Sequence, residues 1–339
     1  MIEHSALRIP HGIADPEGNV AYVAGPEGLI HYLELGTGEI LARTGFSASP
    51  LTIDRGTLVG WRPAPDQPNA VRLFAAVRQG NVLRLKWEET LYLPDWVEVD
   101  SLEPDRFTLE ATIESKLVVV TWEAHSRYRG GAPPPPQVEE AATHHERRTV
   151  RLDPETGAAV GQERTEPALG PEEQVLPEVP PTMRIVPYRS GTSWVTQSWR
   201  VGSADVFLAR TVKEPGIVLV RRDPAGAAGP SEIRLTNDPA AEAAVTPDGR
   251  MVFIHEPGGD APAWHVFSAE TGDRITRLPF DPGTGGVTVV NDQVLYLVVE
   301  DRAGTRRRSL RSRNLQTAEA MWSFLLSEET LRAPPPLRP

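Results

Sequence analysis

A short turn recurs along this chain of 339 residues and constrains its fold more than any other feature. Each copy has a polar residue followed three positions later by Thr, and in three of the copies Gly comes next. The threonine spacings are 156 − 37 = 119, 271 − 156 = 115 and 317 − 271 = 46, so each of the first two intervals has room for one further copy. A period of about 45 to 60 residues predicts a repeated small sheet. The copies lie at residues 34–39, 153–157, 268–273 and 314–319.

The apolar runs between these turns have the character of β-strands. They are short, rich in β-branched residues and bounded by turn residues, which is the strand pattern rather than the helix pattern. Three of them follow a turn in which Asp or Asn can bond its own backbone. We therefore expect central strands that are buried on both faces. The clearest runs are residues 21–24, 117–120, 217–220, 251–254 and 294–299.

Turns and strands together define a four-stranded repeat, and six copies can be placed. The second copy takes Glu89-Thr90 as a degenerate turn, and residues 193–200 leave room for a seventh. The sequence therefore predicts an all-β fold, a single β-propeller of six four-stranded blades, with seven as the alternative. A closed ring of this kind removes exposed sheet edges. The six repeats cover about residues 12–45, 48–95, 98–165, 185–238, 240–280 and 285–326.

Two insertions and a tail interrupt the repeat. Residues 124–148 contain four consecutive prolines, residues 163–182 combine acidic residues with prolines, and residues 331–339 are also rich in Pro. Low apolar content and stiff polyproline geometry predict protruding loops. We expect one domain over residues 1–339, with these segments as additions to it.

Composition excludes several classes of function. The chain has no Cys, which excludes disulfides and thiolate metal sites. Its net charge of −11 argues against nucleic-acid binding and against adhesion to an anionic membrane. The start lacks the basic and apolar regions of a signal peptide, and no window approaches 18 apolar residues. These features predict a cytoplasmic protein.

The turns resemble the quinoprotein-type (PQQ-like) propeller repeat, Ala-x-Asp-x-x-Thr-Gly-x-x-x-Trp. The resemblance implies that the Trp packs between neighbouring blades, and only Trp322 occupies that slot. The opening at residues 246–250 is also similar to WD40 and TolB-like blades. Matching positions are Asp153, Thr156 and Gly157, then Ser268 (in the Asp slot), Thr271 and Gly272, then Thr317 and Trp322 with Asn314 and Ala318 as departures; Ala42, Gly161 and Thr276 stand in the other Trp slots.

The same resemblance implies how the ring is used. Enzymes of the quinoprotein group bind a quinone in the central funnel, with a Ca²⁺ site, a catalytic Asp and often a vicinal disulfide. This chain has no Cys pair and no recognisable ligand cluster. The resemblance therefore points to the non-catalytic branch of the fold, in which the ring binds other proteins.

One arginine cluster is the candidate binding site. Its six arginines fall within twelve residues that contain no acid after Asp301, and we expect an exposed strand near the rim of the ring. Three interpretations stay open: a solvated edge strand whose charges block edge pairing, a docking patch for an acidic partner or for the chain's own acidic segment 163–178, and a phosphate or nucleic-acid site. The members are Arg302, Arg306, Arg307, Arg308, Arg311 and Arg313.

Other candidates have simpler interpretations. Adjacent residues of an extended chain point to opposite faces, so His144 and His145 with Glu146 fit a solvated loop better than a metal site. Three further histidines lie in different repeats without shared spacing. Four scattered carboxylates would have to meet at the funnel mouth to form a metal-dependent lactonase site. The histidines are His31, His255 and His265, and the carboxylates are Glu17, Asp54, Asp100 and Asp248.

The eight tryptophans fit blade packing, although any on an exposed face would be interface anchors. The sequence as a whole predicts a non-enzymatic, cofactor-free scaffold that binds protein partners and neither nucleic acid nor membrane. The alternatives are a metal-dependent lactonase or other hydrolase, and a quinone-binding enzyme that uses the funnel. The tryptophans are Trp61, Trp87, Trp96, Trp122, Trp194, Trp199, Trp264 and Trp322.

Overall fold

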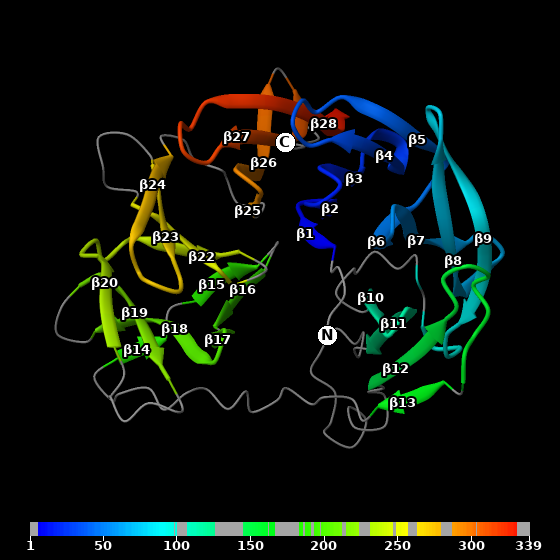
Figure 1. Cartoon of the computed structure of the whole chain (residues 1–339), viewed down its shortest axis with the longest axis horizontal. Coiled ribbons are helices and arrows are strands. Elements are labelled where there is room, and N and C mark those ends of the chain that lie inside the picture. Colours follow the sequence, from blue (N-terminus) through cyan, green and yellow to red (C-terminus); the bar gives the residue numbers. More distant parts are fainter. Residues whose placement is uncertain are drawn as a thin grey trace, which may run out of the picture. The chain divides into compact units, whose positions relative to one another are not determined.

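The computed structural model is almost entirely β (Figure 1). Among the residues that it describes, the only helical element is one 3-10 turn, η1 (Pro26–Gly28). The chain divides into two compact units. Unit 1 comprises Met1–Ala6, His11–Leu35 and Glu39–Gly170, and unit 2 comprises Leu7–Pro10, Gly36–Gly38 and Pro171–Pro339. The structure describes residues 6–97, 99, 107–125, 145–161, 163–166, 183–185, 187–190, 193–196, 198–211, 215–223, 231–246, 249–256, 263–278, 287–302 and 304–330.

Unit 1 contains three antiparallel meanders of four strands each. The first two, β2 to β5 and β6 to β9, are joined where β5 and β9 run parallel and Arg43 lies opposite Val82. The third meander, β10 to β13, is a separate sheet. The strands are β2 (Gly12–Asp15), β3 (Val20–Ala24), β4 (Leu29–Glu34), β5 (Ile40–Ser47), β6 (Ser49–Asp54), β7 (Thr57–Ala64), β8 (Gln67–Gln79), β9 (Val82–Tyr92), β10 (Phe107–Glu114), β11 (Leu117–His125), β12 (His145–Leu152) and β13 (Arg164–Glu166).

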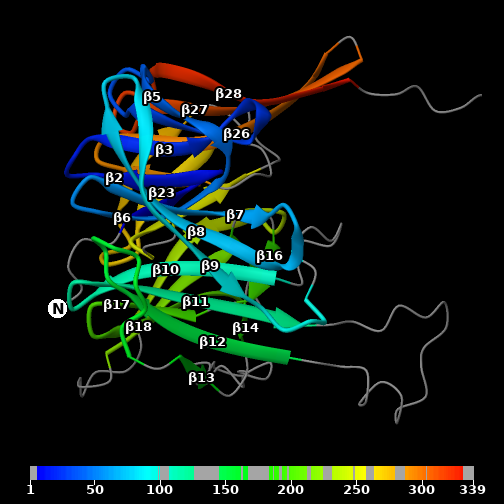
Figure 2. The same cartoon turned by 90° about the vertical axis from the view of Figure 1, so that its right-hand side faces the viewer.

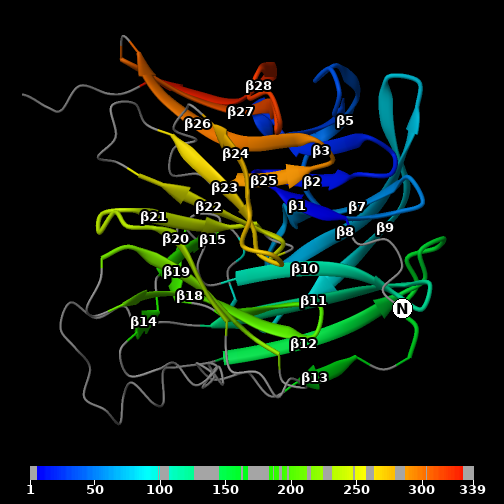
Figure 3. The ribbon, with the colours of Figure 1, turned by 60° about the vertical axis from the view of Figure 1, so that its left-hand side comes forward.

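Unit 2 repeats the meander with additions (Figure 3). Strands β17 to β20 form one meander, and β14 pairs with β18 beside β17. Strands β21 to β24 form another, extended by β15 and β16, and β25 to β28 form a complete sheet of four. The strands are β1 (Leu7–Ile9), β14 (Met183–Ile185), β15 (Pro187–Ser190), β16 (Ser193–Thr196), β17 (Ser198–Val201), β18 (Ala204–Thr211), β19 (Ile217–Arg222), β20 (Ser231–Thr236), β21 (Glu242–Val245), β22 (Met251–His255), β23 (Trp264–Ser268), β24 (Arg274–Leu278), β25 (Val287–Val290), β26 (Gln293–Arg302), β27 (Thr305–Asn314) and β28 (Ala320–Thr330).

These pairings confirm the all-β prediction and the four-stranded, propeller-like sheet. The count of six blades in one ring stays a prediction. Residues 193–200, which left room for a seventh blade, form no sheet of their own in the described part of the chain. Residues 193–196 pair with β15 at the edge of the β21–β24 sheet, whereas residues 198–201 pair with β18.

The predicted boundaries of the two insertions were wrong. The ladder between β11 and β12 continues into the first predicted insertion, where His125 lies opposite His145, and β13 begins within the second. Polar residues fit these positions because one face of such strands is solvated.

The degenerate turn predicted in the second repeat was also misplaced. Glu89 and Thr90 lie inside β9 rather than in a turn, and the chain turns instead at Gly80, whose φ is +64°. Residues 126–144, 167–182 and 331–339 lie outside the described residues.

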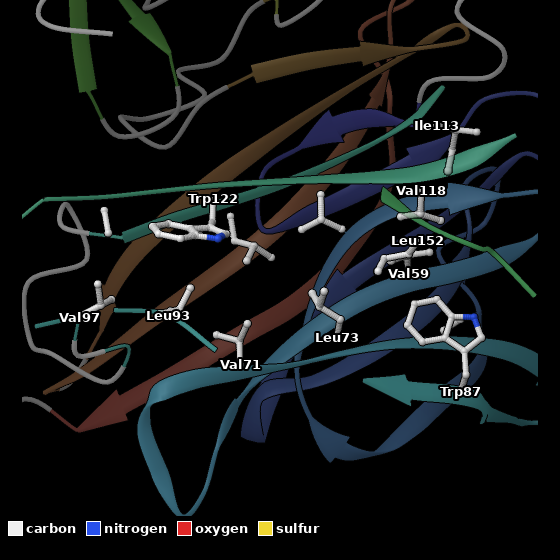
Figure 4. Close-up of a cluster of buried hydrophobic side chains, with 14 residues drawn as sticks. Val59, Val71, Leu73, Trp87, Leu93, Val97, Ile113, Val118, Trp122 and Leu152 are labelled. Atoms are coloured by element: carbon white, nitrogen blue, oxygen red, sulfur yellow. The ribbon is translucent and has the colours of Figure 1, made fainter. Parts of the chain in front are cut away.

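A large apolar cluster fills the space between the β6–β9 and β10–β13 sheets (Figure 4). Alternate residues of β8 and β11 point into it, and Trp122 on β11 is fully buried. Burial of each large apolar side chain stabilises the fold by about 1.5 to 3 kcal/mol. The cluster therefore ties these two sheets of unit 1 together.

The recurring turn also packs against aromatic side chains. Gly157 has a φ of +77°, and a Cβ built on it would lie 2.7 Å from the Trp87 ring. The Trp87 indole donates a hydrogen bond to the Pro154 carbonyl at 2.9 Å. Within unit 2, the predicted Trp322 packs in the same way on Gly38. Glycine is needed at both turns because a side chain would collide with the ring.

Candidate functional site

The arginine cluster lies on β27, which is the third of four strands rather than an edge. Its backbone pairs with β26 from Thr305 to Asn314 and with β28 on the other side. The interpretation of the arginines as charges that block edge pairing is therefore wrong, because β27 has no free edge. The arginines instead alternate between the two faces of a paired strand.

At one end of the β25–β28 sheet, three strands extend beyond the first strand, β25. Strand β25 pairs with β26 only as far as Tyr296, whereas β26, β27 and β28 continue together (Figure 2). We call residues 297–302, 305–310 and 324–330 the three-stranded extension. Four of the six arginines lie in it, and Arg311 and Arg313 follow on β27.

Most of these arginines have acidic or polar partners on the neighbouring strands. Arg306 donates to both Asp301 oxygens at 2.9 and 3.0 Å, Arg307 to Glu328 at 3.2 Å, and Arg311 to Glu300 at 2.8 Å. Arg313 donates to the Tyr296 hydroxyl at 3.0 Å and to the Ala318 carbonyl at 2.7 Å. Hydrogen bonds from Arg306 hold the pKa of the Asp301 carboxyl below its usual range. The absence of nearby acids in the sequence was thus misleading, because strand pairing supplies them.

Arg308 differs from its neighbours. Its side chain makes no hydrogen bond or ion pair with the residues that the structure describes, and its register neighbours are Val299 and Ser327. Val299 is 44% exposed. A guanidinium binds a carboxylate through two parallel hydrogen bonds and also packs on apolar surface. Arg308 and Val299 together can therefore contact a partner that carries both acidic and apolar groups. The side chain of Arg302 lies outside the described residues.

The histidine and glutamate predicted to share a solvated loop lie in a strand. His145 and Glu146 belong to β12, and Glu146 forms an ion pair with Arg148. His144 lies outside the described residues. Glu146 is already engaged, so nothing described here brings these three residues together around a metal ion.

Two of the remaining histidines share a sheet, contrary to the sequence interpretation. His255 ends β22 and stacks on Trp264 with ring centroids 5.2 Å apart, while His265 lies next along β23. His265 Nε2 is 3.7 Å from Glu256, which accepts a hydrogen bond from Thr236 at 2.5 Å. Burial lowers the pKa of His265, and Glu256 opposes that effect. These contacts link β20, β22 and β23.

His31 lies apart from these two, on β4 in unit 1, where it is 7% exposed. Burial, and then the charge of Arg43, lower its pKa. Of the scattered carboxylates, Glu17 and Asp54 belong to the described residues, whereas Asp100 and Asp248 do not. The described part of the chain contains no group of three His, Asp or Glu side chains that could hold a metal ion.

Several tryptophans pack within the sheets, as predicted. Trp122 and Trp264 are buried, Trp87 is almost so, and Trp199 donates to the Gly249 carbonyl at 2.8 Å. The side chain of Trp194 lies outside the described residues. Trp122, Trp264, Trp87 and Trp199 therefore each have a packing role.

A second charged group, which the sequence did not single out, lies on the β6–β9 sheet. Glu88 on β9 accepts hydrogen bonds from Arg62 on β7 at 2.6 Å and from Arg72 on β8 at 3.0 Å. Arg62 and Arg72 lie 26 and 16 positions before Glu88 in the sequence, so local spacing gave no signal.

No family model and no curated protein matches the sequence. Among solved structures, TolB from Acinetobacter baumannii is 12% identical over 92% of this chain and 79% of its own, with a TM-score of 0.31. The Dos1 propeller is 9% identical over 91% and 67%, with a TM-score of 0.25. A prolyl endopeptidase is 12% identical over 94% of this chain but 39% of its own, with a TM-score of 0.26. Similarities this low assign no activity to the chain.

No helix in the described ranges has the length and apolar character needed to cross a membrane.

Proposed function

We propose that this chain is a non-enzymatic β-propeller scaffold that binds a protein partner through the three-stranded extension. The observation that carries the proposal is Arg308, which has no ionic partner among the described residues while its neighbours on β27 are paired. It lies opposite the exposed Val299. Arginine beside apolar surface is a composition enriched at protein interfaces. The partner that fits is an extended protein segment with an acidic and an apolar residue.

The finer architecture is part of the same proposal. Successive meanders along the chain support six blades in one ring. We also propose that the ring derives from a PQQ-like repeat, whose Thr-Gly turns it shares, and that it works in the cytoplasm. The hydrolase and quinone-enzyme alternatives require a convergent ligand set, and the described residues offer no such set for a metal.

The test compares partner recovery by three tagged proteins from native lysate: wild type, Arg308→Gln and Arg84→Gln. Arg84 is exposed on β9 in the other unit and provides a matched loss of charge. We expect one or more partners to be reproducibly recovered by wild type and Arg84→Gln and to be reduced about tenfold with Arg308→Gln. Equal recovery by all three, or no reproducible partner, would contradict the proposal.

A further inference from the structure

The charged group on the β6–β9 sheet forms an ordered row across three strands of unit 1. Register places Arg62 opposite Arg72, and Arg72 opposite Thr90. Tyr92 lies two positions further along the same face of β9 and is 64% exposed. Two like charges directly opposite each other on neighbouring strands repel, so this row needs an anion.

Glu88 supplies that anion, and its carboxylate carries one negative charge for the two arginines. Each of its two oxygens accepts a hydrogen bond from a different arginine. Two guanidinium groups against one carboxylate leave one excess positive charge. The Nε–H of Arg62 is buried and has no hydrogen-bond partner among the residues that the structure describes. The arginine pair therefore has more donor capacity than Glu88 uses.

The pair is also held in position. The Arg62 guanidinium lies 4.7 Å from the centroid of the Phe46 ring, and Phe46 packs edge-on against Phe74. The side chains of Arg62, Arg72 and Glu88 are 24%, 35% and 23% exposed, so the group lies at the surface but is partly shielded from water. Partial desolvation strengthens binding of an anion, and stacking reduces the entropy lost when it binds.

We infer that Arg62 and Arg72 form a second binding site, separate from the three-stranded extension, for a carboxylate side chain of an extended acidic segment of a partner protein. Glu88 occupies the arginines in the unbound protein and shares or yields them when that carboxylate arrives. Thr90 and the exposed ring of Tyr92 extend the site along β9 and contact the remainder of the segment. A peptide fits better than a free ion because these groups continue the surface in one direction.

The experiment measures binding of a fluorescein-labelled hexaglutamate peptide by fluorescence anisotropy at low ionic strength. Wild type should bind saturably. Arg72→Gln should weaken binding about tenfold, because one of the two guanidinium groups of the site is lost. Glu88→Gln should strengthen binding about threefold or more, because the competing carboxylate is removed. Urea unfolding of each variant shows that it is folded under the binding conditions.

A matched variant separates this site from general charge effects. Arg84→Gln removes an exposed arginine from the same strand as Glu88 and should bind the peptide like wild type. Arg308→Gln is measured beside it to show whether the peptide binds at the extension. Arg72→Gln that binds like Arg84→Gln would overturn the inference, and so would a folded Glu88→Gln that does not bind more tightly. Inorganic phosphate that displaces the peptide at an equal concentration of anionic groups would overturn the assignment to a peptide. Loss of binding by Arg308→Gln alone would place the acidic segment on the extension instead.

Discussion

The β6–β9 sheet of unit 1 and the β25–β28 sheet of unit 2 use the same parts differently. Both have long inner strands that carry arginines, and both have a Trp on the outer strand that packs on a glycine turn. On β27 each of three arginines has a carboxylate of its own, whereas Arg62 and Arg72 share Glu88. The acids in register with the arginines, rather than the number of arginines, therefore decide where cationic donors remain available.

The tryptophans of the two sheets, Trp87 and Trp322, differ in how deeply they are buried. Trp87 is 8% exposed and its indole N–H is bonded to the turn that it covers, whereas Trp322 is only half-buried. Yet the glycine opposite each ring has nearly the same φ, +77° and +72°, and the same 2.7 Å limit on a Cβ. Both turns therefore require glycine, whether the Trp ring beside the turn is buried or half-buried.

The largest expected effect is on stability, from substitution of these glycines. Gly157→Ala should lower the free energy of unfolding by about 3 kcal/mol, because left-handed backbone costs an L-residue about 1–2 kcal/mol and the methyl group would overlap Trp87. Gly38→Ala should cost nearly as much. Urea denaturation followed by Trp fluorescence provides the measurement.

Gly80→Ala is the matched control for those two variants. Its φ is +64°, but no atom of the described residues lies within 4 Å of the position of its Cβ, so it should lose only about 1–2 kcal/mol. If Gly157→Ala were no worse than Gly80→Ala, the contact with Trp87 would be no constraint. If Gly38→Ala alone were mild, the two sheets would differ in their turns as well as in their charges.

A smaller effect should separate the two kinds of ion pair. Glu88→Gln should lower the free energy of unfolding by about 1–2 kcal/mol, because it leaves two partly buried guanidinium groups facing each other. Glu328→Gln should cost less than about 0.5 kcal/mol, because its pair with Arg307 is well exposed. Glu89→Gln, at an exposed position beside Glu88, is the control. Equal losses for Glu88→Gln and Glu328→Gln would remove the distinction drawn between the sheets.

The smallest effect is on two aspartate pKa values. Hydrogen bonds from the Thr156 backbone and hydroxyl lower the pKa of Asp153, whereas the Arg306 guanidinium lowers that of Asp301. Salt screens a charge pair more than a backbone hydrogen bond. NMR titration should therefore show the Asp301 pKa rising toward its usual value in 1 M salt while the Asp153 pKa stays low.

The sign of the stability effect follows from the direction of these shifts. Because both pKa values are lower in the folded than in the unfolded protein, each carboxylate contributes stability above the unfolded pKa, and that contribution is lost as the pH falls through the folded value. Arg306→Gln should abolish the shift at Asp301 and leave Asp153 unchanged. An Asp153 pKa that rises with salt as much as that of Asp301 would contradict the hydrogen-bond explanation.

Local features were predictable from the sequence, and their partners were not. The Thr-Gly turns and the apolar strands follow from spacing and turn chemistry, and the slot of Trp322 follows from the resemblance to the PQQ-like repeat. Trp87 was missed as a partner of Gly157 because the two are far apart in sequence and the second turn was placed at Glu89 rather than at Gly80. Likewise, Glu328 lies 21 residues from Arg307, so a local count of acids made β27 seem uncompensated.

Turns and strands that repeat as four-stranded sheets could be predicted from the amino-acid sequence, because turn chemistry and hydrophobic periodicity act between near neighbours. The three-dimensional pairing of strands was needed to show that β27 lies inside its sheet, that its arginines meet acids from both sides, and that Arg62 and Arg72 share one carboxylate. Strand pairing brings together residues 5 to 26 positions apart in these clusters. Register, which sequence spacing does not encode, therefore decides which charges are neutralised and which remain to bind a partner.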